Sequence, residues 1–442
     1  MDSFVIEGGR RLEGRLRVNG SKNAALPLMA ASLLTDAPLV LRDVPRLADI
    51  ANMARLLTEL GVEVEQSENA GDDAPRDFTL TTRSTDESHA RYDIVRTMRA
   101  SVCVLGPMLA RRGQARVSMP GGCAIGERPV DLHLRGLRAL GANIELDGGD
   151  IIATAPAGGR LRGSTIFLGG AFGSTVLGTA NVMCAATLAE GVTIIESAAC
   201  EPEIVDLARL LTAMGARITG AGSPRILIEG VDALGAADHT VIADRIEAGT
   251  LCCAAAITNG SLELENFPLD ALLAVVDRLE AVGVKIEPID NPTDADRLRR
   301  VVRVTSDRSL RPVSVTTQPH PGFPTDCQAQ LMALLCFAEG NSVVTEKIFP
   351  DRFLHVAELT RMGATLVRQG ATVVVSGVKE LRGAPVMASD LRASAGLVLA
   401  GLAARGTTTV NRVYHLDRGY DRLETKLASC GAAIERRKES ES

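Results

Sequence analysis

Leu60-Gly61-Val62-Glu63-Val64 is the first of six similar stretches that set the fold class. Each time, an apolar helix-like run ends in an apolar residue and a glycine, and a β-like stretch follows. Glycine suits this place because the residue after a helix often needs left-handed backbone angles. The six triplets are Leu60-Gly61-Val62, Leu140-Gly141-Ala142, Met214-Gly215-Ala216, Val282-Gly283-Val284, Met362-Gly363-Ala364 and Cys430-Gly431-Ala432.

A second signal, a helix followed by a turn and a strand, alternates with the first. Its turns lie at Asp36-Ala37, Gly113, Gly191, Gly260, Gly340 and Gly406. The strands that follow are rich in β-branched or apolar residues. Six chance matches to a common pattern are the alternative, but two signals in register favour six copies of one α/β unit. The copies form either one closed ring or two groups of three, with a plausible crossover at residues 242–247.

The composition is that of a soluble globular protein large enough for two to four domains, with 442 residues, 46% apolar and 23% charged. Aromatic residues make up only 3% and Trp is absent, so the cores are expected to be aliphatic. Few aromatics argue against base-stacking surfaces for nucleic acid. The net charge of −6 disfavours general binding to nucleic acid or anionic membranes.

Cysteine usage predicts a reducing, cytoplasmic environment. The nine cysteines are odd in number and lie mostly in apolar runs. The N-terminus resembles no signal peptide. The longest uncharged stretch, residues 163–189, is rich in Gly and hydroxyl residues, so it predicts a strand, a loop and a buried helix rather than a membrane span.

Standard cofactor and metal motifs are mostly absent. No glycine-rich dinucleotide or Walker motif follows a strand, and the six histidines lack metal-ligand spacing. The sequence predicts no metal and no cofactor. Residues 67–90 and 289–300 are rich in polar residues and predict surface loops. Arg299, Arg300, Arg303 and Arg311 are expected on a solvated strand face.

The loop at residues 119–129 contains Cys123 between glycines, beside Glu127 and Arg128. A thiolate near Arg has a lowered pKa and can act as a nucleophile or an acid. An inert turn cysteine is the alternative. Other polar loops contain Lys22 and Arg418, and together with Arg128 they are candidates for binding a doubly anionic ligand, because cations of this kind pair with carboxylate and phosphate. Each of these loops alone is more often a helix cap or a surface ion pair.

Several motifs together resemble the UDP-N-acetylglucosamine 1-carboxyvinyltransferase family, the enolpyruvyl transferases of bacterial peptidoglycan synthesis. They span nearly the whole chain in order. The motifs are Ser21-Lys22-Asn23-Ala24-Ala25, Thr97-Met98-Arg99-Ala100-Ser101, Pro120-Gly121-Gly122-Cys123, Arg128-Pro129-Val130-Asp131-Leu132, Phe323-Pro324-Thr325-Asp326, Asp390-Leu391-Arg392-Ala393-Ser394 and Asp417-Arg418-Gly419-Tyr420.

The resemblance implies two inside-out α/β domains, each a threefold repeat of a βαβαββ-type unit, with helices inside and sheets outside. Residues 22–242 would form the first domain, which carries the Cys123 loop, and residues 1–21 with 243–442 the second. Substrates would bind in a cleft that closes around them and excludes water.

The implied reaction joins phosphoenolpyruvate to the 3-hydroxyl of UDP-N-acetylglucosamine by addition and elimination, and releases phosphate. By resemblance, Cys123 donates the proton to the methylene carbon and Asp326 accepts the hydroxyl proton. Lys22, Arg128 and Arg418 match cations around phosphate and carboxylate. The remaining matched positions are Asn23, Arg99, the uracil-binding segment Arg128, Pro129, Val130, Asp131 and Leu132, the diphosphate segment Gly173, Ser174, Thr175 and Val176, and Ile348, Arg352 and Asp390.

One departure from the family pattern is Leu177, which replaces a glycine beside the diphosphate segment and puts its geometry in question. Two alternatives stay open. The related shikimate-pathway enolpyruvyl transferase shares the chemistry but lacks the Cys123 loop and the segment at residues 128–132. A non-catalytic UDP-sugar sensor on the same scaffold needs no proton donor, so Cys123 and Asp326 argue against it.

Overall fold

The computed structural model describes residues 2–67, 76–120, 130–290, 297–307 and 309–438. These residues form two compact units. The first unit lies within residues 20–242, and the second combines residues 2–19 with residues 243–438.

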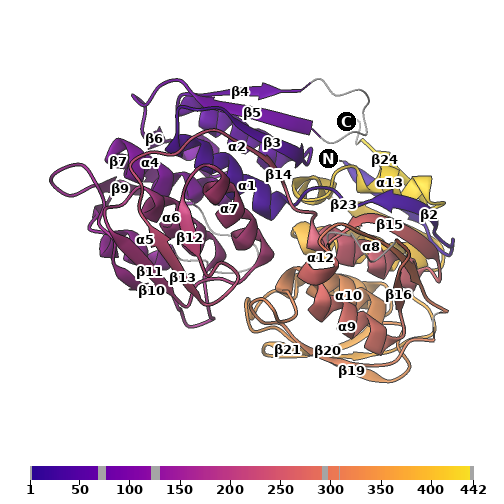
Figure 1. The fold of residues 1–442 in the computed structure, drawn as a ribbon. Coiled ribbons are helices and arrows are strands. Elements are labelled where there is room, and N and C mark those ends of the chain that lie inside the picture. Colours follow the sequence, from indigo (N-terminus) through magenta and orange to yellow (C-terminus); the bar gives the residue numbers. More distant parts are fainter. Residues whose placement is uncertain (1, 68–75, 121–129, 291–296, 308, 439–442) are drawn as a thin grey trace. The chain divides into compact units, whose positions relative to one another are not determined.

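Six four-stranded sheets, three in each unit, share one topology within the described residues (Figure 1). In each sheet an outer strand runs parallel to its neighbour, and the other two pairings are antiparallel. In the sheet β10-β11-β13-β12, helix α6 makes the parallel crossover, so the chain order is βαβαββ. This arrangement confirms the six copies of one α/β unit predicted from the sequence.

The first unit holds three sheets, β14-β3-β5-β4, β6-β7-β9-β8 and β10-β11-β13-β12. Its strands are β3 (Leu39–Val44), β4 (Val62–Gln66), β5 (Arg76–Thr82), β6 (His89–Ala90), β7 (Gln114–Ser118), β8 (Asn143–Asp147), β9 (Asp150–Thr154), β10 (Thr165–Phe167), β11 (Val192–Glu196), β12 (Arg217–Thr219), β13 (Arg225–Glu229) and β14 (Ala237–Thr240). Its helices are α1 (Lys22–Ala30), η1 (Ala31–Leu34), α2 (Ala48–Glu59), α3 (Tyr92–Val95), η2 (Arg99–Val104), α4 (Leu105–Arg112), α5 (Asp131–Ala139), α6 (Val176–Thr187) and α7 (Pro202–Ala213).

The second unit holds the sheets β2-β15-β17-β16, β18-β19-β21-β20 and β22-β23-β1-β24. Its strands are β1 (Ser3–Glu7), β2 (Glu13–Arg17), β15 (Ser261–Phe267), β16 (Lys285–Pro288), β17 (Arg300–Thr305), β18 (Ser314–Thr316), β19 (Asn341–Thr345), β20 (Thr365–Gln369), β21 (Thr372–Ser376), β22 (Pro385–Met387), β23 (Thr407–Asn411) and β24 (Ala433–Arg437). Its helices are α8 (Arg245–Ile257), η3 (Leu269–Ala271), α9 (Leu273–Val282), η4 (Thr325–Cys327), α10 (Gln328–Leu335), α11 (Leu354–Arg361), α12 (Leu391–Ala403), η5 (Val413–Arg418) and α13 (Leu423–Ser429).

All six predicted helix-ending glycines have positive φ, between 84° and 113°. A side chain in this region is strained, so glycine ends each helix at low cost and turns the chain into the next strand. At the second set of turns, Gly260 differs. There Asn259 takes the positive φ of 55°, and Gly260 is required for lack of space, since a Cβ on it would lie 2.3 Å from the carbonyl oxygen of Leu12.

Helices fill the centre of each unit and the sheets cover them. In the second unit every residue of α8 and α10 is buried, and α12 packs against both (Figure 1). Strands such as β13 and β23 alternate buried and exposed residues, so one face of each sheet is solvated. In each repeat the first helix therefore lies at the core of its unit. The N-terminal residues of these core helices lie close to one another within the unit.

Two expectations from the sequence were wrong: the surface loop at residues 67–90 and the solvated position of Arg300. Residues 67–90 contain β5, whose Phe78 and Leu80 are buried between β3 and β4. Threonines made this stretch look like a loop, although Thr favours strands. Arg300 is buried and bonded to Asp290, with Nε 2.9 Å and Nη2 2.7 Å from its oxygens, rather than solvated. No helix among the described residues is long and apolar enough to span a membrane.

Candidate active site

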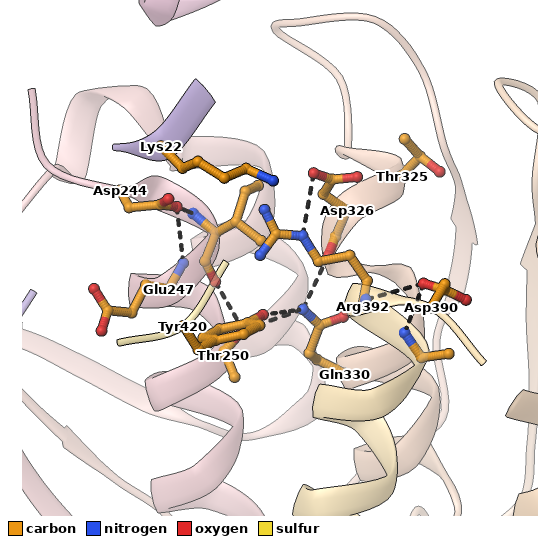
Figure 2. Close-up of polar contacts among 12 residues, drawn as sticks. Lys22, Asp244, Glu247, Thr250, Thr325, Asp326, Gln330, Asp390, Arg392 and Tyr420 are labelled. Carbon is orange, nitrogen blue, oxygen red and sulfur yellow. Dashed lines mark hydrogen bonds and ion pairs between the residues drawn. The ribbon is translucent and has the colours of Figure 1, made fainter. Parts of the chain in front are cut away.

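Asp326 is the carboxylate at which two arginines of the second unit, Arg352 and Arg392, meet. Figure 2 shows its contact with Arg392. Pro324 precedes the short helix η4, and this turn presents Asp326 ahead of the buried helix α10. Its Oδ1 accepts from Arg352 Nη1 at 2.7 Å, and its Oδ2 accepts from Arg392 Nε at 3.2 Å. Asp326 thus combines a fixed carboxylate with a partly exposed position, as its side chain is 26% exposed.

Arg392 lies in the first turn of α12 and is almost fully buried. Asp390 caps this helix, since its Oδ1 accepts from the backbone N–H groups of Arg392 and Ala393 at 2.9 and 3.1 Å. Burial lowers the pKa of the Arg392 guanidinium, but Tyr420 and the carboxylates of Asp326 and Asp244 raise it by more. Among the described residues, Nη1 and Nη2 of Arg392 find no hydrogen-bond partner. A buried cation with two open donor groups is suited to bind a carboxylate or phosphate.

Glu346, fully buried after strand β19, organises the loop that carries two predicted residues. Its Oε1 accepts from the backbone N–H groups of Ile348 and Phe349, at 2.8 and 3.0 Å. Its Oε2 accepts from Thr325 Oγ1 at 2.9 Å, and that hydroxyl also accepts from Arg352 Nη1 at 3.0 Å. Glu346 therefore links the Ile348 loop to the Asp326 turn.

Two histidines connect the other predicted residues of the second unit. The pKa of His355 is lowered to about 4, mainly by burial, with Asp390 acting to raise it and Arg352 to lower it. Burial and the charge of Arg418 lower the pKa of His415, while Asp390 raises it. The charge of Asp390 therefore acts on both histidines, that of Arg352 on His355 and that of Arg418 on His415. Arg352 is also bonded to Asp326.

In the first unit, Lys22 is the first residue of α1. Ser21 is the N-cap, and its Oγ accepts from Ala24 N at 3.3 Å, which places Lys22 and Asn23 in the first turn. Lys22 is buried, with Nζ 3.3 Å from Oδ2 of Asp49 on α2. The Asp49 carboxylate therefore holds the buried Lys22 ammonium in a defined position, where it can pair with a negatively charged group of a ligand.

The segments expected to bind the nucleotide lie at the starts of α5 and α6. Val130 is the N-cap of α5, where Asp131 and Leu132 form the first turn, and Thr175 is the N-cap of α6. The Gly173 turn joins them, because Gly170 exchanges two backbone hydrogen bonds with Gly173 and lies against Leu132. Helix N-termini offer unpaired N–H groups to anions.

The other described residues predicted in the first unit lie next to Thr175 or at the start of η2. Ser174 and Val176 are half-buried on either side of Thr175, and Arg99 is half-buried at the start of η2. Leu177 is half-buried and packs against the core of the unit. Cys123, Arg128 and Pro129 lie outside the described residues. Among the described residues, no three or more His, Cys, Asp or Glu side chains form a metal-binding group.

Sequence reasoning missed three residues of these sites. Arg392 belongs to one of the family motifs, but only its neighbour Asp390 was expected to contact a ligand. Its place in the first turn of a helix capped by Asp390 was the available signal. Asp49 and Glu346 gave no signal, because one lies inside an amphipathic helix and the other is a lone acid after a strand.

Enolpyruvyl transferases are among the solved structures that match this fold. The enolpyruvyl transferase NikO from Streptomyces tendae matches with a TM-score of 0.86 and 26% identity over 98% of both chains. EPSP synthase from Acinetobacter baumannii shares the fold at 18% identity, with a TM-score of 0.76 over 99% of this chain and 100% of that one. These structures confirm the predicted fold class.

The sequence model of the family described as EPSP synthase (3-phosphoshikimate 1-carboxyvinyltransferase) matches residues 6–427, so the chain belongs to this family. Within it, the chain is 53% identical to the UDP-N-acetylglucosamine 1-carboxyvinyltransferase of Anaeromyxobacter sp. over 99% of this chain and 100% of the relative. It is 54% identical to the protein of that name from Gluconacetobacter diazotrophicus, again over 99% and 100%. The resemblance predicted from the motifs is thereby confirmed.

Proposed function

We propose that this chain transfers the enolpyruvyl group of phosphoenolpyruvate to the 3-hydroxyl of UDP-N-acetylglucosamine and releases phosphate, the first committed step of peptidoglycan synthesis. The full-length relatives named for this activity support the acceptor. The observation that carries the chemistry is the Asp326 carboxylate between Arg352 and Arg392. The free cysteines among the described residues support action in the reducing cytoplasm.

In the addition step, the sugar oxygen bonds to C2 of phosphoenolpyruvate as its proton passes to Asp326. Cys123 supplies the proton that the methylene carbon gains. In the elimination step, the methyl carbon formed from that methylene returns a proton to the Cys123 thiolate, and the C2–O bond to phosphate breaks as the proton on Asp326 passes to the leaving phosphate, which restores the double bond and both side chains. Both steps balance with the two substrates alone, so no cofactor enters.

The cations have separate tasks in this proposal. Lys22, Arg128 and Arg418 bind the phosphate group. Arg392 can donate to Asp326 through Nε. Its two Nη groups, which have no partner among the described residues, can bind the substrate carboxylate through the bidentate hydrogen bonds typical of Arg. Arg352 fixes the other oxygen of Asp326 and keeps the base oriented toward the hydroxyl.

The acceptor is bound by the remaining predicted residues. The N-terminal amides of α6, with Gly173 to Val176, bind the diphosphate, and Leu177 packs against the core beside them. Residues 128–132 bind uracil, Asn23 and Arg99 contact the ligand, and Ile348 contacts the N-acetyl side of the sugar. Asp390 is a further carboxylate of the active site.

Phosphate release with each acceptor tests the proposal. Purified protein with phosphoenolpyruvate is expected to release phosphate with UDP-N-acetylglucosamine and not with shikimate 3-phosphate. Release with shikimate 3-phosphate alone would assign the other reaction of the family. Tight calorimetric binding of UDP-N-acetylglucosamine without any release would identify a sensor.

A further inference from the structure

Tyr420 closes a buried polar network beneath Arg392 (Figure 2). The tyrosine is only 2% exposed and lies just beyond η5. Its Oη is 2.8 Å from Thr250 Oγ1 on α8 and accepts from Gln330 Nε2 on α10 at 3.1 Å. The same Gln330 Nε2 lies 2.9 Å from the backbone oxygen of Asp326. One hydroxyl is thus fixed by two core helices, and one of its partners also holds the Asp326 turn.

The ring of Tyr420 faces the guanidinium of Arg392, with Cζ 5.3 Å from the ring centroid. A cation over an aromatic face is attracted by the electrons of the ring, most strongly where water is excluded. Both groups are buried, so water does not weaken this contact. Burial raises the pKa of Tyr420, which keeps its hydroxyl in the neutral form.

These contacts fix three features of Arg392. The ring of Tyr420 holds the guanidinium group, Asp326 holds Nε, and the capped first turn of α12 holds the backbone. What remains open are Nη1 and Nη2, which are buried and find no partner among the described residues. An arginine held this way does not have to be ordered when a carboxylate arrives, so less binding energy is lost.

We infer that Tyr420 is a positioning residue, which acts through Arg392 and orients its Nη groups toward the carboxylate of the three-carbon substrate. The inference rests on the proposed function and adds a residue to it. The competing interpretation is that Tyr420 only fills the core of the second unit, like other buried aromatic side chains there.

Three variants separate the two interpretations. Tyr420→Leu removes the ring face and the hydroxyl, and Tyr420→Phe removes the hydroxyl alone. Phe267→Leu is the matched control, because Phe267 is a fully buried aromatic residue of the same core on β15, and none of the contacts described above involves it. For each protein, KM for both substrates, kcat and the melting temperature are measured.

A positioning role predicts that Tyr420→Leu raises KM for phosphoenolpyruvate about 30-fold, the size of a desolvated cation–π contact. KM for UDP-N-acetylglucosamine is expected to stay within about twofold. Tyr420→Phe keeps the ring and should shift KM for phosphoenolpyruvate by only about two- to threefold. Phe267→Leu should lower the melting temperature and leave both KM values unchanged.

A double-mutant cycle with Arg392→Lys supplies the decisive readout. If Tyr420 acts through Arg392, Tyr420→Phe adds almost nothing to the KM of the Arg392→Lys protein. Effects of Tyr420→Phe and Arg392→Lys that simply add, or a Tyr420→Leu protein with the KM of wild type, would overturn the inference. Should Tyr420→Leu fail to fold, the cycle with Tyr420→Phe still separates the two interpretations. Wild-type protein that releases no phosphate would instead refute the proposed function.

Discussion

At the scale of single residues, Asp326 illustrates how the second unit prepares a carboxylate for chemistry. Two guanidinium groups, from the loop before α11 and from α12, each hold one of its oxygens. Gln330 holds its backbone oxygen. A base held from three sides is oriented before any substrate binds, and this preorganisation lowers the barrier of proton transfer.

Asp326→Asn should lower kcat by about 10²- to 10⁴-fold, because the amide keeps the shape but cannot take a proton. KM should change less than kcat, since the amide oxygen still accepts from one of the two arginines, while the amide nitrogen faces the other. Steady-state phosphate release measures both constants. Asp351→Asn is the control, as this neighbouring carboxylate is 84% exposed and bonded to Arg368. A kcat equal to that of wild type would remove the assigned role.

Cys123→Ser should abolish covalent inactivation by thiol-directed epoxides of the fosfomycin type. A serine hydroxyl is a far weaker nucleophile than a thiolate at neutral pH. Intact-protein mass measures the adduct. Cys200→Ser is the control and should be labelled like wild type, because Cys200 is half-buried and its pKa is raised, mainly by burial. Covalent labelling of the Cys123→Ser protein would assign the reactive group elsewhere.

His355 predicts a pH dependence of stability. Its pKa is about 4 in the folded protein and near 6.5 in an unfolded chain, so the unfolded state binds the extra proton between these values. Stability is therefore lost as pH falls from 6.5 toward 4, by up to about 1.4 kcal/mol per pH unit from this group. In denaturant unfolding, the stability difference between wild type and His355→Gln should shrink over this range. A difference that stays constant with pH would show that His355 is not held neutral by burial.

At the scale of elements, the helix-ending glycines carry the repeat. Left-handed angles after each helix are a local requirement, so they could be predicted from the sequence alone. Strand β5 could not, because its polar composition hides two buried residues whose partners lie in β3 and β4. The pairing of Asp326 with Arg392, 66 residues apart, depends on the packing of α10 against α12, which no local pattern contains.

Two of these glycines should differ in tolerance. Gly215→Ala should cost about 1 kcal/mol, because its φ of 108° strains an L-residue while no atom lies within 4 Å of the new Cβ. Gly61→Ala should cost about 2 kcal/mol more, because the new Cβ would lie 2.4 Å from the backbone oxygen of Ser84. Both lie in the first unit, so denaturant unfolding compares them directly. Equal midpoints would contradict the role given to the Ser84 contact.

At the scale of the whole molecule, strands distant in sequence complete the repeats. In the first unit β14 joins β3 from the other end of the unit's sequence, and in the second unit β1 and β2 join β23 and β15. The family resemblance implied that residues 1–21 belong with residues 243–442, but the strand pairings themselves were not predicted, since β1 and β2 pair with partners more than 200 residues away. The exchange ties the N-terminal residues 3–17 into the unit that carries Asp326.

Phosphate release by the wild type and by Cys123→Asp, with phosphoenolpyruvate and UDP-N-acetylglucosamine together, tests the central claim most directly. Enolpyruvyl transfer with Cys123 as the acid predicts steady release that requires both substrates. Cys123→Asp should sustain this release, because a carboxylic acid can also donate a proton, and should no longer react with epoxides. No release by the wild type with UDP-N-acetylglucosamine, or release with shikimate 3-phosphate in its place, would contradict the proposed reaction.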